Sequence, residues 1–171
     1  MSKDYNSDNG FSVSIWGSIQ WQFLHIISFN YPVNPTKEDK INYHNYVMSL
    51  KHVLPCSACR INYSKNLKDA GYNKSKLKNR DTFSRFIYDL HNAVNLSLGK
   101  KVYKTFEEVR ETYNHFRAKC TSLGSASKES GCILPVNNIK AQCVIHIIPM
   151  KPKQESLVID KKCIPKKNKT S

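Results

Sequence analysis

Glycine is scarce in this sequence and long apolar runs are absent, and each shortage excludes a class of function. Six glycines occur among 171 residues, and none forms the G-x-G-x-x-G or G-x-x-x-x-G-K-[ST] pattern of nucleotide-phosphate loops. No apolar run reaches the roughly eighteen residues that a membrane-spanning helix needs. Residues 1–10 are polar and lack the apolar core of a secretory signal, so we expect the chain to stay in the compartment where it is made.

Acidic residues are also few, with 13 Asp and Glu against 27 Lys and Arg and a formal net charge of +14. Such a surplus raises the question of a nucleic-acid or acidic-lipid partner. No more than two basic residues are consecutive, so there is no concentrated basic arm. This distribution favours a generally basic, solvated surface over a dedicated nucleic-acid site.

Helical periodicity dominates residues 13–119. Apolar residues recur at helical spacing over about 14–30, 37–54, 56–70, 81–98 and 105–116, with short connections. Thr36 and Thr105 open capping-box patterns, and Asp81 is a plausible N-cap. In the first segment both apolar faces are expected to be buried. The sequence therefore predicts an all-α protein: a small four-helix bundle with a short fifth helix.

The composition changes after Cys120, where Ser, Lys, Asn and Pro replace the helical pattern. Only the short runs 144–148 and 157–159 favour β structure. We therefore expect a flexible N-terminus at 1–12, a helical domain at 13–119 and a basic, mostly irregular tail at 120–171.

The most informative motif is Cys56-Ser57-Ala58-Cys59, which follows Pro55 at the expected start of a helix. The backbone N–H groups of a helix N-terminus stabilise a thiolate there. A C-x-x-C pair alone also occurs in zinc sites or as buried structural cysteines. A zinc site would need further ligands such as His91 or His115, because no second C-x-x-C is present.

Two polar clusters lie on either side of this pair in the sequence. Trp21 and His25 lie one turn apart on one helical segment, with the small Gly17 one turn earlier. His91 and Asn95 share a face of another. An aromatic ring, two imidazoles and carboxamides directed into a bundle suit a large planar ligand with polar edges.

The order W-G-x-x-x-W-x-x-L-H, then P-C-x-x-C, then H-N-x-V-N-x-x-L-G-K resembles the FAD-linked sulfhydryl oxidases of the Erv/ALR family, most closely their compact virus-encoded members. The resemblance covers about residues 14–116. It implies FAD as cofactor, with Cys56 and Cys59 as the catalytic redox pair. It also implies FAD-contacting positions at Gly17, Trp21, His25, His52, His91, Asn92, Val94, Asn95, Leu98, Lys100, Tyr103 and Tyr113.

The resemblance further implies the reaction and the partners. Thiol-containing protein substrates, with a thioredoxin-like relay as one option, would be oxidised, and O2 would accept the electrons and give H2O2. A homodimer, no membrane span and no nucleic-acid partner are expected, and the location would be host cytoplasm or virion. This sequence departs from the family in having Tyr113 where a Trp is frequent and in lacking the shuttle C-x-x-C of many members. Cys120 with Cys132 is the tail pair that would best serve as an internal relay; the alternative is that the tail cysteines are incidental or form disulfides within the tail.

Two functions from other classes remain as alternatives: a zinc-stabilised interaction module and a basic nucleic-acid-binding helical protein. Neither explains why Trp21, His25, His91 and Asn95 occur in this order with a C-x-x-C pair between them.

Overall fold

The computed structural model describes residues 6–102, 104–121, 131–136, 144 and 160. The chain divides into two compact units, residues 1–104 and 105–171. The first unit contains α1 (Val13–Asn30), α2 (Lys37–Val53), α3 (Ser57–Asp69), the short 3-10 helix η1 (Lys74–Leu77) and α4 (Arg80–Ser97). The second contains α5 (Phe106–Asn114), β1 (Ala118–Thr121) and β2 (Gly131–Pro135). The predicted all-α class is confirmed.

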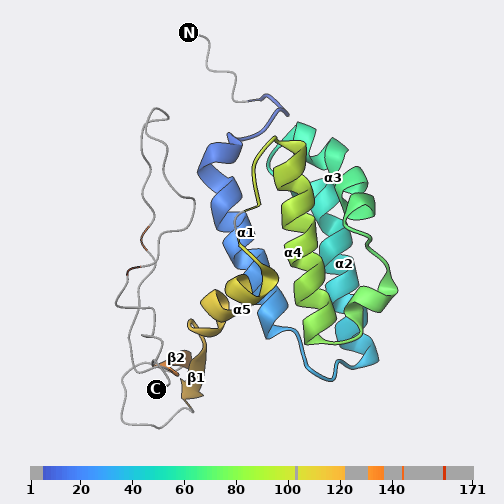
Figure 1. Cartoon of the computed structure of the whole chain (residues 1–171). Coiled ribbons are helices and arrows are strands. Elements are labelled where there is room, and N and C mark those ends of the chain that lie inside the picture. Colours follow the sequence, from blue (N-terminus) through green and yellow to red (C-terminus); the bar gives the residue numbers. More distant parts are fainter. Residues whose placement is uncertain (1–5, 103, 122–130, 137–143, 145–159, 161–171) are drawn as a thin grey trace. The chain divides into compact units, whose positions relative to one another are not determined.

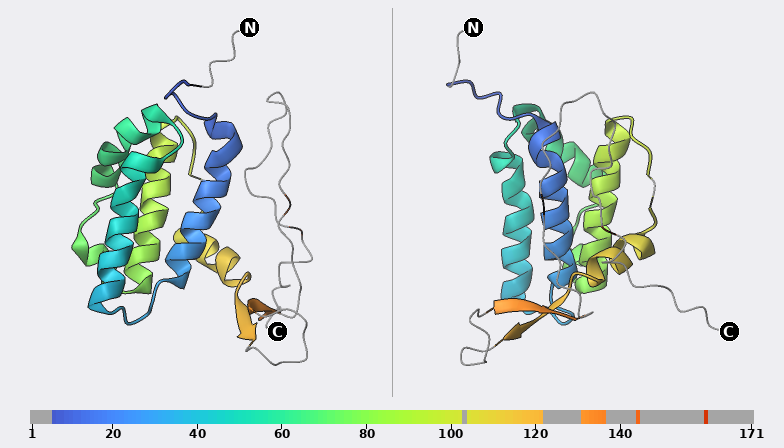
Figure 2. Two further views of the ribbon diagram at one scale, coloured as in Figure 1. Left: turned by 180° about the vertical axis from the view of Figure 1, so that it is seen from behind. Right: turned by 90° about the vertical axis from the view of Figure 1, so that its left-hand side faces the viewer.

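Packing within the first unit brings α1 against α4, and α3 against both α2 and α4 (Figures 1 and 2). Tyr31, just after α1, is fully buried together with Phe86 and Leu90 of α4. The hydroxyl of Tyr31 donates to the backbone carbonyl of Leu77 at 2.9 Å, which satisfies the one polar atom of this buried side chain. Val47 of α2 completes this core, so all four long helices share one apolar centre.

Capping boxes fix the first turns of three helices. The predicted boxes at Thr36 and Thr105 are confirmed, because each hydroxyl accepts from the backbone N–H three residues later. The predicted N-cap at Asp81 is wrong. Asn79 caps α4: its side chain accepts from Thr82 N at 3.0 Å, and the Thr82 hydroxyl accepts from Asn79 N at 3.1 Å. Asp81 lies in the first turn of α4 instead, where its carboxylate interacts favourably with the positive end of the helix dipole.

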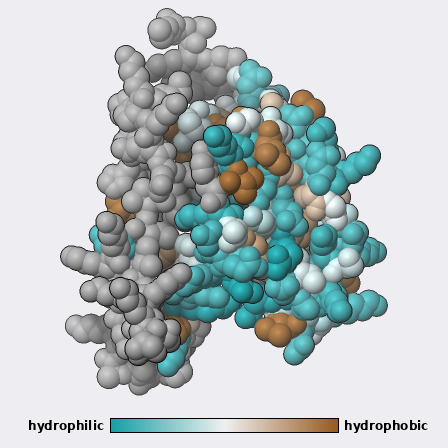
Figure 3. Space-filling view, in the orientation of Figure 1, coloured by the Kyte–Doolittle hydropathy of each residue, from teal (hydrophilic) through white to brown (hydrophobic). Residues whose placement is uncertain are grey.

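Among the residues that the structure describes, only one side of α1 is buried, which corrects the prediction that both sides are. Leu24, His25 and Phe29 lie in the interior. The other face carries exposed apolar side chains, here called the α1 stripe: Ile15, Ile19, Phe23 and Ile26, which are 50%, 42%, 54% and 49% exposed. Apolar residues otherwise form small scattered patches on the mainly hydrophilic face seen in Figure 3.

The second unit contains a small antiparallel sheet that the sequence did not predict. β1 pairs with β2 in the register Ala118↔Pro135, Lys119↔Leu134 and Thr121↔Gly131, with an irregularity between Lys119 and Thr121. The expectation of helix throughout residues 13–119 is therefore wrong at its end. The β runs expected at 144–148 and 157–159 lie outside the described residues, apart from Val144.

Among the described residues, no helix combines the length and apolar character needed to cross a membrane.

Candidate active site

The cysteine pair lies at the first turn of α3. Cys56 is the N-cap residue, in extended conformation, and it forms a disulfide with Cys59 across a Cα–Cα distance of 5.1 Å. Both residues are half-buried. The backbone N–H of Cys59 donates to Sγ of Cys56 at 3.2 Å. Because this N–H belongs to the positive end of a helix, it stabilises negative charge on Cys56 whenever the pair is reduced.

The sequence around Pro55 explains why Cys56 begins a new helix. α2 ends at Val53, and Pro55 cannot continue it because proline lacks a backbone N–H. Leu54 is buried, which anchors the turn, and its carbonyl accepts from Cys56 N at 2.8 Å and from Arg60 Nη1 at 2.6 Å. The guanidinium of Arg60 thus holds the backbone carbonyl of this turn.

Three of the predicted cofactor residues meet where α1 packs against α4. The rings of Trp21 and His91 stack with centroids 4.2 Å apart and an interplanar angle of 8°. His25 Nε2 and His91 Nδ1 lie 3.0 Å apart and share a hydrogen bond, with the donor set by the tautomers. Trp21 also packs against the hydrophobic core that Cys59 touches, so the redox pair and the ring cluster rest on one core.

Burial keeps both histidines neutral at physiological pH. Desolvation, followed by the nearby His91, lowers the pKa of His25 from 6.5 to about 3. Desolvation, followed by the positive charge of Lys100, lowers the pKa of His91 to about 4. Neutral imidazoles offer one donor and one acceptor each, so this cluster presents hydrogen-bonding edges without net charge.

The other predicted cofactor residues are placed less specifically. Gly17 is buried on α1. Asn92, Val94 and Asn95 are half-buried on α4, whereas Leu98 and Lys100 beyond its last turn are exposed. His52, in the last turn of α2, is exposed. Tyr113 is buried in the second unit, and Tyr103 lies outside the described residues.

Sequence reasoning missed the segment that lies beside Cys56, here called the N-terminal strap (residues 8–11). It falls in the stretch expected to be flexible, yet Gly10 forms an antiparallel β-bridge with Cys56. Backbone hydrogen bonding carries almost no composition signal, so an isolated glycine in a polar stretch was the only available indication. Trp16, which belongs to the first motif, has a related role: its Nε1–H donates to the carbonyl of Phe11 at 3.1 Å.

The part of the chain that the structure describes contains no cluster of side chains that could bind a metal ion. No three His, Cys, Asp or Glu side chains there are grouped to hold an ion. Cys56 and Cys59 are joined to each other, and Cys132 is also disulfide-bonded.

The site thus belongs to an all-α protein that combines a disulfide at a helix N-terminus with a stacked indole–imidazole pair, and comparison with known proteins identifies the family. Residues 18–115, more than half of the chain, match the Erv1/Alr family model. The chain belongs to the Erv1/Alr family.

Relatives of this chain include viral and cellular proteins. A probable FAD-linked sulfhydryl oxidase of Acanthamoeba polyphaga mimivirus is 40% identical over 96 residues, covering 56% of this chain and 66% of that protein. A putative FAD-linked sulfhydryl oxidase of Invertebrate iridescent virus 6 is 32% identical, covering 50% and 81%. FAD-linked sulfhydryl oxidase ERV1 of Arabidopsis thaliana is 31% identical, and the match spans under half of its length, 44%. These names do not favour the zinc-module or nucleic-acid alternatives.

The fold itself is similar to the crystal structure of the yeast Erv1 core. The TM-score is 0.54 at 23% identity, with 66% of this chain and 92% of that chain covered. This likeness supports the helical bundle.

Proposed function

We propose that this protein is an FAD-linked thiol oxidase that makes disulfide bonds in protein substrates. The observation that carries the proposal is the Cys56–Cys59 disulfide at the start of α3, resting on the same core as the stacked Trp21–His91 pair. A disulfide at a helix N-terminus suits thiol exchange, because the helix stabilises the thiolate produced. The relatives named as sulfhydryl oxidases add their support.

The proposed exchange begins at Cys56. A substrate thiolate attacks Sγ of Cys56, and Cys59 departs as a thiolate. The second substrate thiol then displaces Cys56, whose sulfur accepts the Cys59 N–H while it carries negative charge. The substrate leaves with a new disulfide, and both cysteines of the protein are reduced.

The residues of the ring cluster fit a flavin dinucleotide in chemical character. Trp21 supplies a flat apolar face, and neutral His25 and His91 supply uncharged hydrogen-bonding edges. We also assign contact with FAD to Gly17, Asn92, Val94, Asn95, Leu98 and Lys100. The resemblance to the family implies three further FAD-contacting positions: His52, Tyr103 and Tyr113. These residues would hold FAD, which would supply the two-electron chemistry that links the reduced cysteines to O2 and gives H2O2.

The α1 stripe supports a homodimer as the working form. Four large apolar side chains exposed on one helix face are costly in water, and a second copy of the same face would cover them. We expect Ile19→Glu to shift the protein from dimer to monomer in sedimentation analysis. A monomeric parent protein would contradict this assignment.

The viral relatives support a viral source, with host cytoplasm or virion as the location. Detection of the protein in purified virions by mass spectrometry would test this part of the proposal.

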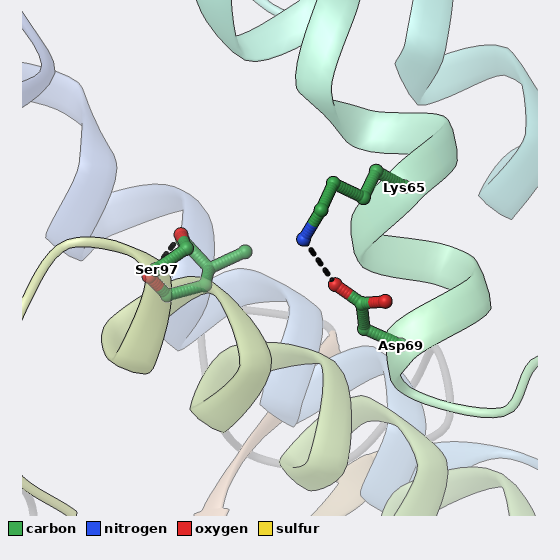
Figure 4. A network of polar contacts seen from close by, with 4 residues as sticks. Lys65, Asp69 and Ser97 are labelled. Atoms are coloured by element: carbon green, nitrogen blue, oxygen red, sulfur yellow. Dashed lines mark hydrogen bonds and ion pairs between the residues drawn. The ribbon is translucent and has the colours of Figure 1, made fainter.

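Absorption spectroscopy and oxygen consumption test the function directly. The purified protein should be yellow, should bleach with dithiothreitol and should recover its colour in air. Cys59→Ser should retain the colour but lose oxygen consumption. Lys65→Gln is the matched control on the same helix: Lys65 pairs with Asp69, at 2.7 Å on the exposed side of α3 (Figure 4), and its loss should leave the rate unchanged. A colourless folded protein that consumes no oxygen would overturn the proposal.

A further inference from the structure

The N-terminal strap runs antiparallel to the residues that carry the redox disulfide. Phe11 N donates to the carbonyl of Pro55 at 2.7 Å, and Ser57 N donates to the carbonyl of Asn9 at 3.0 Å. Ser57 is the first residue of α3, so its N–H has no acceptor within the helix. The strap therefore occupies a short backbone edge that would otherwise face solvent beside the cysteine pair.

The register of this bridge places Gly10 directly opposite Cys56. Because the flanking residues make the hydrogen bonds, Gly10 and Cys56 form a non-hydrogen-bonded pair, in which Cα atoms typically lie about 4.5 Å apart. Disulfide-bonded cysteines have Cα separations of about 4.4–6.8 Å. A cysteine at the position of Gly10 on an extended client segment would therefore lie within disulfide range of Cys56.

Gly10 is the residue that lets the strap lie there without reacting. Its φ is +95°, and a Cβ atom built on it would lie 2.5 Å from the carbonyl oxygen of Pro55. A side chain is thus incompatible with the positive-φ backbone that the strap adopts at Gly10, whereas a client segment would enter with the negative φ of an ordinary strand, which directs its Cβ elsewhere. The strap consequently fills the edge beside Cys56 while presenting no thiol to it.

The strap contributes main-chain atoms, and no side chain, to the interactions described here that hold it in place. Besides the two bridge bonds, Arg60 Nη2 donates to the carbonyl of Asp8 at 3.3 Å, and Trp16 Nε1 donates to that of Phe11. The side chains of residues 8–11 are exposed, Phe11 by 76%. A segment without buried side chains opens readily. The edge it covers recognises backbone, which suits clients of varied sequence.

We propose that an extended, cysteine-containing client segment displaces the strap and docks as an antiparallel strand along residues 55–57, with its cysteine opposite Cys56. This inference rests on the proposed thiol exchange and adds how the substrate is positioned. The client thiolate attacks Cys56 Sγ, forming a client–Cys56 disulfide as the Cys56–Cys59 bond breaks. A second client thiolate then releases Cys56. The client loses two electrons, the cysteine pair gains them, and the client's thiol protons pass to solvent or to the reduced pair.

Backbone-methylated peptides test this docking on the parent protein. In the proposed register the residue after the client cysteine donates its N–H to Pro55 O, whereas the cysteine N–H faces away, as at Gly10. N-methylation of the following residue should raise KM for a dithiol peptide about tenfold, the loss of one well-made hydrogen bond. N-methylation of the cysteine itself is the matched control. Equal KM values for the two peptides would overturn the proposal.

Strap release is tested by Gly10→Ala, with Gly71→Ala as its control. Both glycines have positive φ, but a Cβ at Gly71 meets nothing within 4 Å. Gly10→Ala should lower KM for the peptide severalfold by freeing the edge, as expected when a competing closed state is removed. The rate with dithiothreitol, which needs no backbone docking, should match that of Gly71→Ala. An unchanged or higher peptide KM in Gly10→Ala would contradict strap displacement.

Hydrogen exchange at the Ser57 amide separates this inference from the proposed function. In Gly10→Ala this amide should exchange faster than in the parent. A peptide with serine in place of cysteine should protect it again, and the peptide methylated at the following residue should not. This readout requires no oxidase activity, so a protein that fails to oxidise dithiothreitol still tests the docking. Absence of protection by the unmethylated peptide would overturn the docking edge.

Discussion

Acidification should destabilise this protein through its buried histidine pair. In the unfolded chain His25 takes up a proton below about pH 6.5, but in the folded protein burial lowers its pKa to about 3. The unfolded state therefore binds more protons between these values, and stability falls as the pH falls. From about pH 7 to about pH 5, His25 alone should lower the free energy of unfolding by about 2 kcal/mol. His91 acts in the same direction, since its pKa is lowered to about 4.

Urea unfolding at the two pH values, followed by circular dichroism, measures this loss. His25→Gln should lose about 2 kcal/mol less free energy than the parent over this pH change. Asp89 acts in the opposite direction, because burial raises the pKa of its carboxyl, but it is common to both proteins. An equal loss in His25→Gln and the parent would refute the assignment of a buried, neutral His25.

Three further outcomes are expected from the fold and the tail. Leu90→Ala removes a fully buried side chain at the centre of the core, so thermal or urea unfolding should show a loss of about 3 kcal/mol, and a loss below about 1 kcal/mol would contradict that placement. Thr36→Ala removes the capping box of α2 and should cost about 1 kcal/mol in the same assay, while Thr36→Ser should restore most of it. Cys132→Ser tests the internal relay through Cys120 and Cys132. We expect this variant to oxidise protein clients more slowly than the parent while its rate on dithiothreitol is unchanged. A variant that matches the parent on both substrates would eliminate the relay.

Helix boundaries followed from the sequence where the signal is local. The boxes at Thr36 and Thr105 each depend on a side chain and a backbone group three residues apart, which a short window of sequence contains. The N-cap of α4 was misassigned because both Asn79 and Asp81 are residue types that favour this position. The Thr82 hydroxyl decides between them, and it does so by completing the box with Asn79.

Non-local backbone pairing could not be predicted in the same way. β1 is stabilised by β2, which begins ten residues after β1 ends, and the four residues of β1 are too few for their alternation to identify a strand. The strap pairs across more than forty residues through backbone atoms that every amino acid possesses. In contrast, Trp21, His25 and His91 were recognised as a group because their side-chain types and helical spacing carry the information.

The turn between α2 and α3 connects three properties that a thiol exchange site requires. Pro55 ends one helix, which leaves Cys56 at the N-terminus of the next with its sulfur on the Cys59 N–H. The same reversal leaves the Pro55 carbonyl and the Ser57 N–H without hydrogen-bond partners inside either helix, and both bind the strap. Thiolate stabilisation and backbone docking therefore have a common structural origin. Pro55→Ala, which lets α2 extend, should therefore weaken thiolate stabilisation and backbone docking together. In this variant the KM for the peptide should rise and the rate with dithiothreitol should fall.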